Sequence, residues 1–560
     1  MFNVIWCRLF NQKEWGYLMK KTEKILFLGF SVLMFILIGC NSKDNLQENK
    51  KSSAVEQTAN LTAATPIQSL DPATAVDQTS VTLLANVMEG LYRLDKKNQS
   101  EPALAEKLPD ISKDGKTYTI SLRKDATWTD KTPVTAEDFV FAWQRVVDPN
   151  TASQNVGLFA PIENAEEISK GSKAKESLGI KAVNNHTLQI ALKEPTPYFT
   201  NLLALPAFLP VNHKFADKHK KDYGTSKDTI STNGAFNLTN LEGLGTSDSW
   251  VIEKNTNYWD NKNVSMNTIH FQVIKEINTG VNLYKDGQLD EAPLGGEYAK
   301  QYKSDKDYSS SLLATSMYLE LNKKPKDSIL KNKNLRKSIS YAIDRASLVE
   351  KLLDNGSIAS VGLVPKKLVY DPKTKKDFAD QDLVGYDKEK AKKYWENAQK
   401  ELTVPNNLKL DILVGDGEFE KKAGEFLQNQ LQESLKGLTV TVTPVPANAQ
   451  IEKLSKGDFS ISLIGWQAGY ADPLSFLANF KTNSPMNYGG YESNEFDILL
   501  KDTSDNRLKS LKEAEELLID DSAIVPIIQT GSSKLINPNL KDINLHSVGS
   551  RYDYREMKKK

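Results

Sequence analysis

Hydrophobic and polar positions repeat with two different periods along this chain. Residues 118–122 alternate as a half-buried strand does, and comparable short runs lie at 188–192, 250–254, 317–321, 408–414 and 440–443. Residues 136–143 instead carry apolar side chains at helical spacing, directly after Thr135, a residue type that caps helices. A second helical pattern covers 335–353, with Gly356 just beyond its end. Short strands mixed with helices over a long chain predict an α/β fold.

One apolar run near the N-terminus has a different character. From Met19 the chain has a lysine-rich start, an apolar stretch over 25–38 and then Gly39-Cys40. This order is typical of a secretory signal, and the stretch is shorter than the roughly 20 residues that span a bilayer. Its aliphatic-x-Gly-Cys ending resembles the lipobox of bacterial lipoproteins, which implies a lipid on the Cys40 thiol. We therefore expect a signal peptide over 1–39 with translation starting at Met19. Residues 1–18 would then be an over-extended gene start, and a genuine but unusual leader is the alternative.

Composition limits what the exported part can be. Without residues 1–39 the chain has 67 basic and 70 acidic residues, a balance that gives no attraction to nucleic acid. Residues 40–58 carry almost no large apolar side chains, so we predict a flexible tether there. No cysteine follows Cys40, and a body of this length can bury enough apolar surface without disulfides. Its length predicts two or three lobes.

The sequence contains no pattern that indicates catalysis. The five histidines, at 186, 213, 219, 270 and 546, lack metal-ligand spacing, and Gly115-Lys116-Thr117 lacks the first glycine of a phosphate loop. The paired acids Glu515-Glu516 and Asp520-Asp521 fit a solvated helix face. We therefore predict no catalytic residue, no metal and no cofactor. A secreted hydrolase that uses carboxylates stays an open alternative.

The segment 101–145, EPALAEKLPDISKDGKTYTISLRKDATWTDKTPVTAEDFVFAWQR, carries the most specific signal. It resembles the signature of the extracellular solute-binding proteins of family 5, the oligopeptide-binding lipoproteins of ABC importers. Further matches follow in the family's order, at 69–72, 89–91, 233–236, 257–260, 335–345, 362–365 and 465–473. We assign most of these residues to the scaffold, with Thr135 as a helix cap and Trp128, Phe139 and Trp143 in a lobe core.

The resemblance implies a type II periplasmic-binding-protein-like fold, a two-lobed α/β clamp with an additional lobe and mixed sheets flanked by helices. It implies lobe I from residues 59–80, 205–305 and 532–560, lobe II from 81–204 and lobe III from 306–531. Peptide would lie between protein strands and be held through its backbone, so that its side chains can vary.

The same resemblance implies the candidate peptide-binding residues. They lie in a predicted strand over 64–68, in the loop 465–470 and in the segment 487–491: Ala64, Thr65, Pro66, Ile67, Gln68, Trp466, Gln467, Ala468, Gly469, Tyr470, Asn487, Tyr488 and Tyr491. The chain departs from many members at two positions. Gly469 replaces an aspartate that pairs with the peptide α-ammonium, and Leu463 replaces an arginine that some members use for carboxylates. Two alternatives stay open: Asp472 or another acid supplies the missing negative charge from a shifted position, or Gly469 reflects local sequence drift without a functional meaning.

These departures favour a specialised ligand. A binding protein without both charged anchors depends more on apolar pockets and backbone carbonyls. The chain is in this respect similar to the lipoproteins that capture short hydrophobic sex-pheromone peptides and pass them to the oligopeptide permease to control plasmid conjugation. This similarity implies a monomer, tethered to the membrane by its lipid, that captures a short hydrophobic peptide and passes it to the membrane subunits of an ABC-type oligopeptide permease. Generic nutrient peptide uptake is the alternative, and a surface adhesin or chaperone on the same fold is a third class.

Overall fold

The N-terminal strand of the body joins a sheet whose other strands lie between residues 236 and 273. The computed structural model describes residues 56–402 and 408–560. In this four-stranded sheet β1 runs parallel to β10, and β9 and β8 continue it in antiparallel fashion. Leu61, Ile252 and Ile269 are buried in it. The strands are β1 (Thr58–Ala63), β10 (Thr268–Val273), β9 (Ser249–Lys254) and β8 (Phe236–Asn240).

A second four-stranded sheet is antiparallel and carries the signature segment. Its order is β4 (Asp110–Ile111), β5 (Thr117–Ser121), β7 (Thr187–Ala191) and β6 (Ile180–Asn184). Helix α2 (Ala136–Val147) packs beside it and buries Phe139 and Trp143. At its start the Asp138 carboxylate accepts the Thr135 N–H at 2.8 Å and the Trp128 indole N–H at 3.1 Å. The predicted helix start and aromatic core are confirmed.

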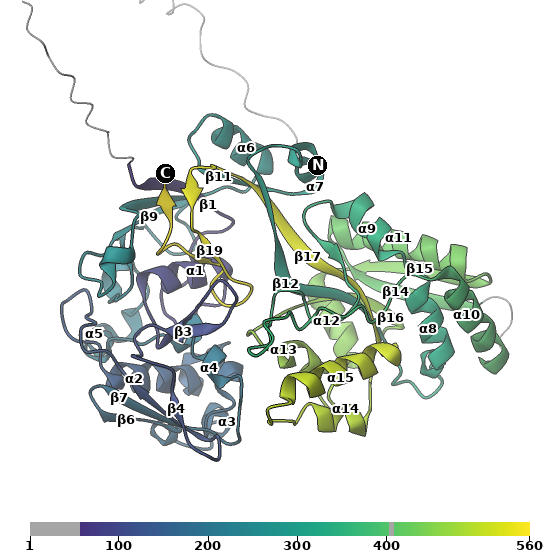
Figure 1. The fold of residues 1–560 in the computed structure, drawn as a ribbon, viewed down its shortest axis with the longest axis horizontal. Coiled ribbons are helices and arrows are strands. Elements are labelled where there is room, and N and C mark those ends of the chain that lie inside the picture. The colour runs from purple at the N-terminus through teal and green to yellow at the C-terminus, as the bar shows by residue number, and fades with distance from the viewer. Residues whose placement is uncertain (1–55, 403–407) are drawn as a thin grey trace, which may run out of the picture. The chain divides into compact units, whose positions relative to one another are not determined.

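The largest sheet has seven strands and mixed directions. Its order is β11-β17-β12-β16-β14-β15, with β13 pairing β17. The long strands β12 and β17 run side by side, as Figure 1 shows, and β14 is parallel to both β15 and β16. Its strands are β11 (Glu291–Leu294), β12 (Tyr308–Leu321), β13 (Ile358–Ala359), β14 (Leu408–Gly415), β15 (Leu438–Val445), β16 (Ile461–Gln467) and β17 (Ile524–Ile536). Parallel strands need crossovers, and α11 and α12 supply them.

Short hairpins and helices complete the described residues. The small strands are β2 (Tyr92–Leu94), β3 (Ser100–Pro102), β18 (Leu540–Lys541), β19 (Asn544–Leu545), β20 (Tyr552–Asp553) and β21 (Lys558–Lys559). The other helices are α1 (Gln78–Val87), α3 (Ala165–Ser169), α4 (Phe199–Leu202), α5 (His213–His219), α6 (Ile277–Lys285), α7 (Gly296–Tyr302), α8 (Lys333–Tyr341), α9 (Arg345–Leu348), α10 (Lys388–Leu402), α11 (Glu418–Ser434), α12 (Ala447–Lys456), α13 (Leu474–Leu477), α14 (Asn494–Leu499) and α15 (Arg507–Asp520). None of the helices in the described ranges has the length and apolar character that crossing a bilayer requires.

The predicted continuous helix over 335–353 is wrong. Helix α8 ends at Tyr341, and α9 starts again at Arg345 before a π-helical turn over Val349–Leu353. Asp344 causes the break, because its carboxylate accepts the Ser347 N–H at 3.0 Å and thus caps a new helix. The buried Arg345 side chain then donates to backbone carbonyls at Ser340 and Pro526, which fixes the corner.

The prediction that Glu515 lies on a solvated helix face is also wrong. It is buried, and its Oε1 accepts the backbone N–H groups of Leu363 and Val364 at 2.6 and 2.8 Å. Burial raises the pKa of Glu515 to about 7. Asp520, by contrast, is exposed and pairs with Lys337. The predicted signal peptide, Cys40 and most of the tether lie outside the described residues, and β1 begins at Thr58.

Candidate ligand-binding site

Strand β16 leaves part of its backbone edge without a strand neighbour. On one side it pairs with β12 along its whole length, from Ile461 to Gln467. On the other side, β14 reaches only Ile461 and Ser462. Among the residues that the structure describes, no strand therefore pairs with the second edge over 464–467. The chain continues from Gln467 with an Ala468 N–H bond to the Ala314 carbonyl at 2.8 Å. A free edge of this kind can accept an added extended peptide.

The predicted strand over 64–68 is wrong, because β1 ends at Ala63. Pro66 has no N–H to give to a ladder, and the Gln68 N–H donates to the Ser80 hydroxyl at 2.8 Å instead. The Ile67 carbonyl accepts the Gly245 N–H at 2.7 Å, and the Thr65 hydroxyl lies 3.0 Å from that of Thr79. Of the five predicted residues only Ala64 lines one of the cavities described below, together with Thr62 and Ala63 of β1.

The first cavity lies beside Gly469 and has a volume of about 410 Å³. Within the described part of the chain, none of its lining residues is charged. Most are apolar, and Gln78, Asn155 and Gln467 supply the side-chain polar groups. The lining residues are Ala75, Val76, Gln78, Val81, Asn155, Leu158, Leu205, Pro206, Ala207, Gln467, Ala468, Gly469 and Gly549. The predicted residues Gln467, Ala468 and Gly469 therefore share one cavity.

Neither family anchor has a charged substitute at its expected place. Leu463 is buried, and the Asp472 carboxylate is occupied by Arg507. Arg507 Nη1 lies 2.8 Å from Asp472 Oδ2, and its Nη2 lies 2.5 Å from Oδ1. Both carboxylate oxygens of this buried acid are thus engaged, so it is not available to a peptide ammonium group. Asp472 fixes the loop instead, where the ring of Tyr470 stacks on that of Tyr198 at 4.8 Å.

Ser475 holds the same loop from within. Its hydroxyl accepts the Gly469 N–H at 2.8 Å, and its carbonyl accepts the Trp466 indole N–H at 2.7 Å. Gly469 itself is exposed. A Cβ placed there would meet nothing nearer than the Ser475 hydroxyl at 4.0 Å. The missing aspartate is therefore not excluded by lack of space.

The second cavity has a volume of about 240 Å³ and an aromatic wall. Trp250 and Phe271 stack at 5.3 Å, Tyr552 and Tyr554 stack at 5.7 Å, and Phe271 lies 5.7 Å from Tyr554. Its charged residues are Glu291, Lys534 and Arg551. Gln78, at the start of α1, lines both cavities, which makes them neighbours. The sequence did not predict the residues of the second cavity. The only local signal is the spacing of Tyr552 and Tyr554, which places both rings on the same side of an extended chain.

The structure places Asn487, Tyr488 and Tyr491 elsewhere. The Asn487 side chain donates to the Tyr491 carbonyl at 2.7 Å, and the Gly489 N–H donates to Glu320 Oε1 at 2.6 Å. Gln467 pairs with Thr315 of β12, and Glu320 follows five residues later in the same strand. At the usual rise of a strand, the segment that contacts Glu320 is therefore roughly 17 Å from Gln467 along β12. These three residues line neither cavity.

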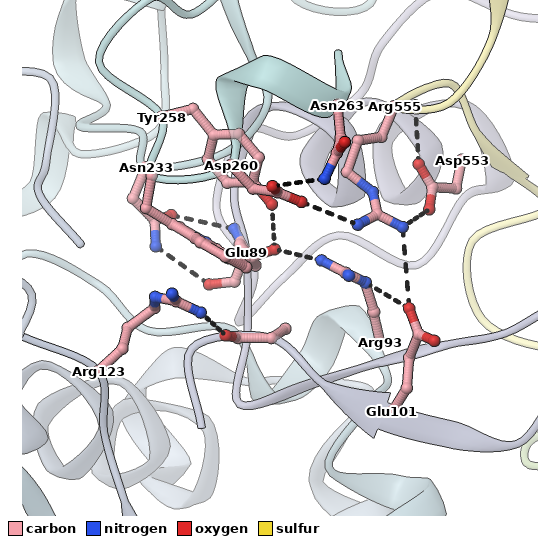
Figure 2. A network of polar contacts seen from close by, with 12 residues as sticks. Glu89, Arg93, Glu101, Arg123, Asn233, Tyr258, Asp260, Asn263, Asp553 and Arg555 are labelled. Atoms are coloured by element: carbon pink, nitrogen blue, oxygen red, sulfur yellow. Dashed lines mark hydrogen bonds and ion pairs between the residues drawn. The ribbon is translucent and has the colours of Figure 1, made fainter. Parts of the chain in front are cut away.

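A partly buried ion-pair network anchors the C-terminal hairpin of β19 and β20, which contributes Tyr552 to the second cavity. The buried Arg555 guanidinium lies 3.7 Å from Asp553 and 3.8 Å from both Asp260 and Glu101 (Figure 2). Arg93 joins it, with its Nε 2.7 Å from Glu101 Oε1. Several carboxylates around each guanidinium offset the cost of burying these charges.

Glu89 continues this network toward the signature segments. Arg93 Nη1 lies 3.1 Å from Glu89 Oε1, which also accepts the Tyr258 hydroxyl (Figure 2). The Trp259 indole N–H donates to the other oxygen at 2.6 Å. The matched segments at 89–91 and 257–260 thus meet through Glu89, which is a scaffold role.

Mixed sheets, cavities built from distant chain segments and a strand edge open to an added peptide fit a protein that binds an extended ligand. The model of the bacterial extracellular solute-binding proteins, family 5, matches residues 99–488. A dipeptide-binding protein of Lactococcus lactis is 34% identical over 558 residues, covering 96% of this chain and 99% of the relative. The chain therefore belongs to the extracellular solute-binding proteins of family 5.

Solved structures agree with this membership. The pheromone receptor PrgZ is 61% identical with a TM-score of 0.72, over 90% of this chain and 100% of the receptor. The oligopeptide-binding protein OppA of Listeria monocytogenes, bound to peptide, is 37% identical with a TM-score of 0.70, over 90% and 99% of the two chains. The predicted family and its two-lobed α/β clamp are confirmed.

Proposed function

We propose that this protein captures short apolar peptides, a hydrophobic pheromone among them, and delivers them to an ABC-type oligopeptide permease. It acts as a monomer on the extracytoplasmic face of the membrane, where a lipid on Cys40 holds it through the tether. It binds its ligand without altering it.

The uncharged cavity beside Gly469 is the observation that supports an apolar ligand most strongly. A peptide with charged side chains would lose its hydration there and meet no opposite charge. Apolar side chains gain about 25 cal/mol for each Å² that they remove from water. The cavity therefore favours apolar peptides over charged ones of equal length.

The free edge of β16 supports recognition of the peptide backbone. Backbone N–H and C=O groups over 464–467 can pair with an extended peptide whatever its side chains, so the edge supplies affinity and the cavities supply selectivity. The end of β1 lines the second cavity and offers a second contact for the same peptide.

The relatives support two ligand ranges. PrgZ, at 61% identity, is named a peptide-binding pheromone receptor, which favours a peptide pheromone as the ligand. The dipeptide-binding protein of Lactococcus lactis and the oligopeptide-binding protein of Bacillus subtilis, at 34% and 32% identity, favour general nutrient uptake as the second candidate.

Two synthetic heptapeptide libraries separate these candidates. One contains only apolar and hydroxyl side chains, and the other has lysine or glutamate at alternate positions. We expect the protein to retain the apolar library at least about tenfold better, a difference of about 1.4 kcal/mol. Equal retention would favour nutrient uptake, and retention of neither library would contradict peptide binding.

The anchor is tested separately. Cells grown with radiolabelled palmitate should label the wild-type protein and not the Cys40→Ala variant. Equal labelling of both would contradict lipidation at Cys40.

A further inference from the structure

The second cavity combines an aromatic wall with an excess of positive charge. Its volume of about 240 Å³ exceeds that of an apolar cavity of roughly 150 Å³ that holds benzene, so one large apolar side chain fits. The rings of Trp250, Phe271, Tyr552 and Tyr554 line one wall of this space. Stacked aromatic walls favour apolar side chains over hydrated ones.

The charges in this cavity do not cancel. Glu291 Oε2 lies 2.7 Å from Lys534 Nζ, and this pair is largely buried. Burial opposes the charged form of Lys534, but the Glu291 carboxylate and the Tyr552 side chain together raise its pKa above the usual value. The Arg551 guanidinium has no such partner. Among the residues that the structure describes, no carboxylate lies within ion-pair distance of it, and its Nη2 donates to the Ser311 hydroxyl at 3.1 Å.

One acid and two bases leave a single positive charge beside an apolar pocket. A carboxylate attached to an apolar residue would pair with this charge and fill the apolar pocket at the same time. A free peptide ends in such a group, because its last residue carries its side chain and α-carboxylate on one carbon. Arginine binds carboxylates through two parallel N–H bonds, and Arg551 also lies over the Tyr552 ring at 5.6 Å.

The position of the cavity fits the end of a bound peptide. Gln78 connects it to the uncharged cavity beside Gly469, and the end of β1 borders it at Thr62 and Ala63. An extended peptide that starts at the uncharged cavity would reach the second cavity after passing Gln78. The ammonium end of the peptide would then lie in the uncharged cavity beside Gly469, and its carboxylate end would lie in the second cavity beside Arg551.

We propose that the second cavity binds the C-terminal residue of the peptide, with the apolar side chain against Tyr552 and Tyr554 and the α-carboxylate on Arg551. This inference rests on the proposed peptide-binding function. It assigns to Arg551 the carboxylate-binding role that Leu463 cannot perform, and it makes the C-terminal hairpin a determinant of specificity.

The test uses the apolar heptapeptide library made once as free acids and once as C-terminal amides. The mature chain with Cys40→Ser is mixed with equal amounts of both forms, and captured peptides are counted by mass spectrometry. We expect the acid form to exceed the amide about tenfold, because one charge-assisted contact is worth about 1.5 kcal/mol.

Variants assign the preference to a residue. Arg551→Gln should capture acid and amide equally while it retains the amide as the parent does, and Arg551→Lys should keep a reduced preference. Lys541→Gln removes one exposed positive charge and should behave as the parent. A parent ratio near one, or an unchanged ratio in Arg551→Gln, would overturn the carboxylate site and leave peptide binding intact. Capture of neither form by the parent would instead contradict the proposed function.

Discussion

Restoring an aspartate at position 469 should give the protein a recognition site for the peptide α-ammonium. The Gly469→Asp side chain has room, because the nearest atom to its Cβ would be the Ser475 hydroxyl at 4.0 Å. No cation lines the adjoining cavity in the described part of the chain, so the new carboxylate has no competing partner there. A hydrogen bond between charged groups contributes about 1.5–3 kcal/mol, and the exposure of residue 469 favours the lower value.

The assay compares one apolar peptide with its N-acetylated form by isothermal titration calorimetry. The parent should bind the two forms alike, and Gly469→Asp should bind the free amine about tenfold more tightly than the acetylated form. Gly469→Asn serves as the control, since it adds similar volume without charge and should show no preference. A parent that already prefers the free amine tenfold would refute the reasoning, because an acid elsewhere would then hold the ammonium.

Three further predictions concern buried ionisable groups. Arg507→Met should lower the free energy of unfolding by about 3–5 kcal/mol, because it leaves the buried Asp472 carboxylate unpaired. Adding Asp472→Leu should restore much of this loss, and a loss below about 1 kcal/mol in urea titrations of Arg507→Met would contradict the prediction. Burial lowers the pKa of His546 below 6.5, so the unfolded state binds a proton first and the stability of the fold should fall as the pH drops below 6.5. His546→Gln should lose this part of the pH dependence, and an unchanged slope of stability against pH would contradict the prediction. Glu515 shows the opposite sign. Burial raises its pKa from 4.5 to about 7, so its contribution should be complete below pH 4.5 and decline as pH rises to about 7, and the stability difference between the parent and Glu515→Gln should follow that course.

Elements that depend on local periodicity could be predicted from the sequence. Tyr118 and Ile120 are both buried on one face of β5, as their alternation indicates. The helix over 335–353 could not be predicted correctly, because the apolar spacing continues through the break. The break depends on the Asp344 cap and on one hydrogen bond from Arg345 to the Pro526 carbonyl, in a strand about 180 residues later.

The site could be predicted only where the family motif is continuous in sequence. Gln467, Ala468 and Gly469 share a cavity, whereas the aromatic cavity joins residues from β1, β9, β10, β17 and the C-terminal hairpin. No local pattern brings Trp250 next to Tyr552. The role of Asp472 could not be predicted either. Its partner Arg507 lies 35 residues away in sequence, and this ion pair makes the Asp472 charge unavailable to a peptide.

The most direct test of an apolar peptide ligand is native mass spectrometry of the mature chain with Cys40→Ser, purified from its own host. The ligand is then released and sequenced. We predict one short apolar peptide, or a few, with a free C-terminal carboxylate. A broad mixture that includes charged peptides, or a protein without any bound peptide, would contradict selective capture.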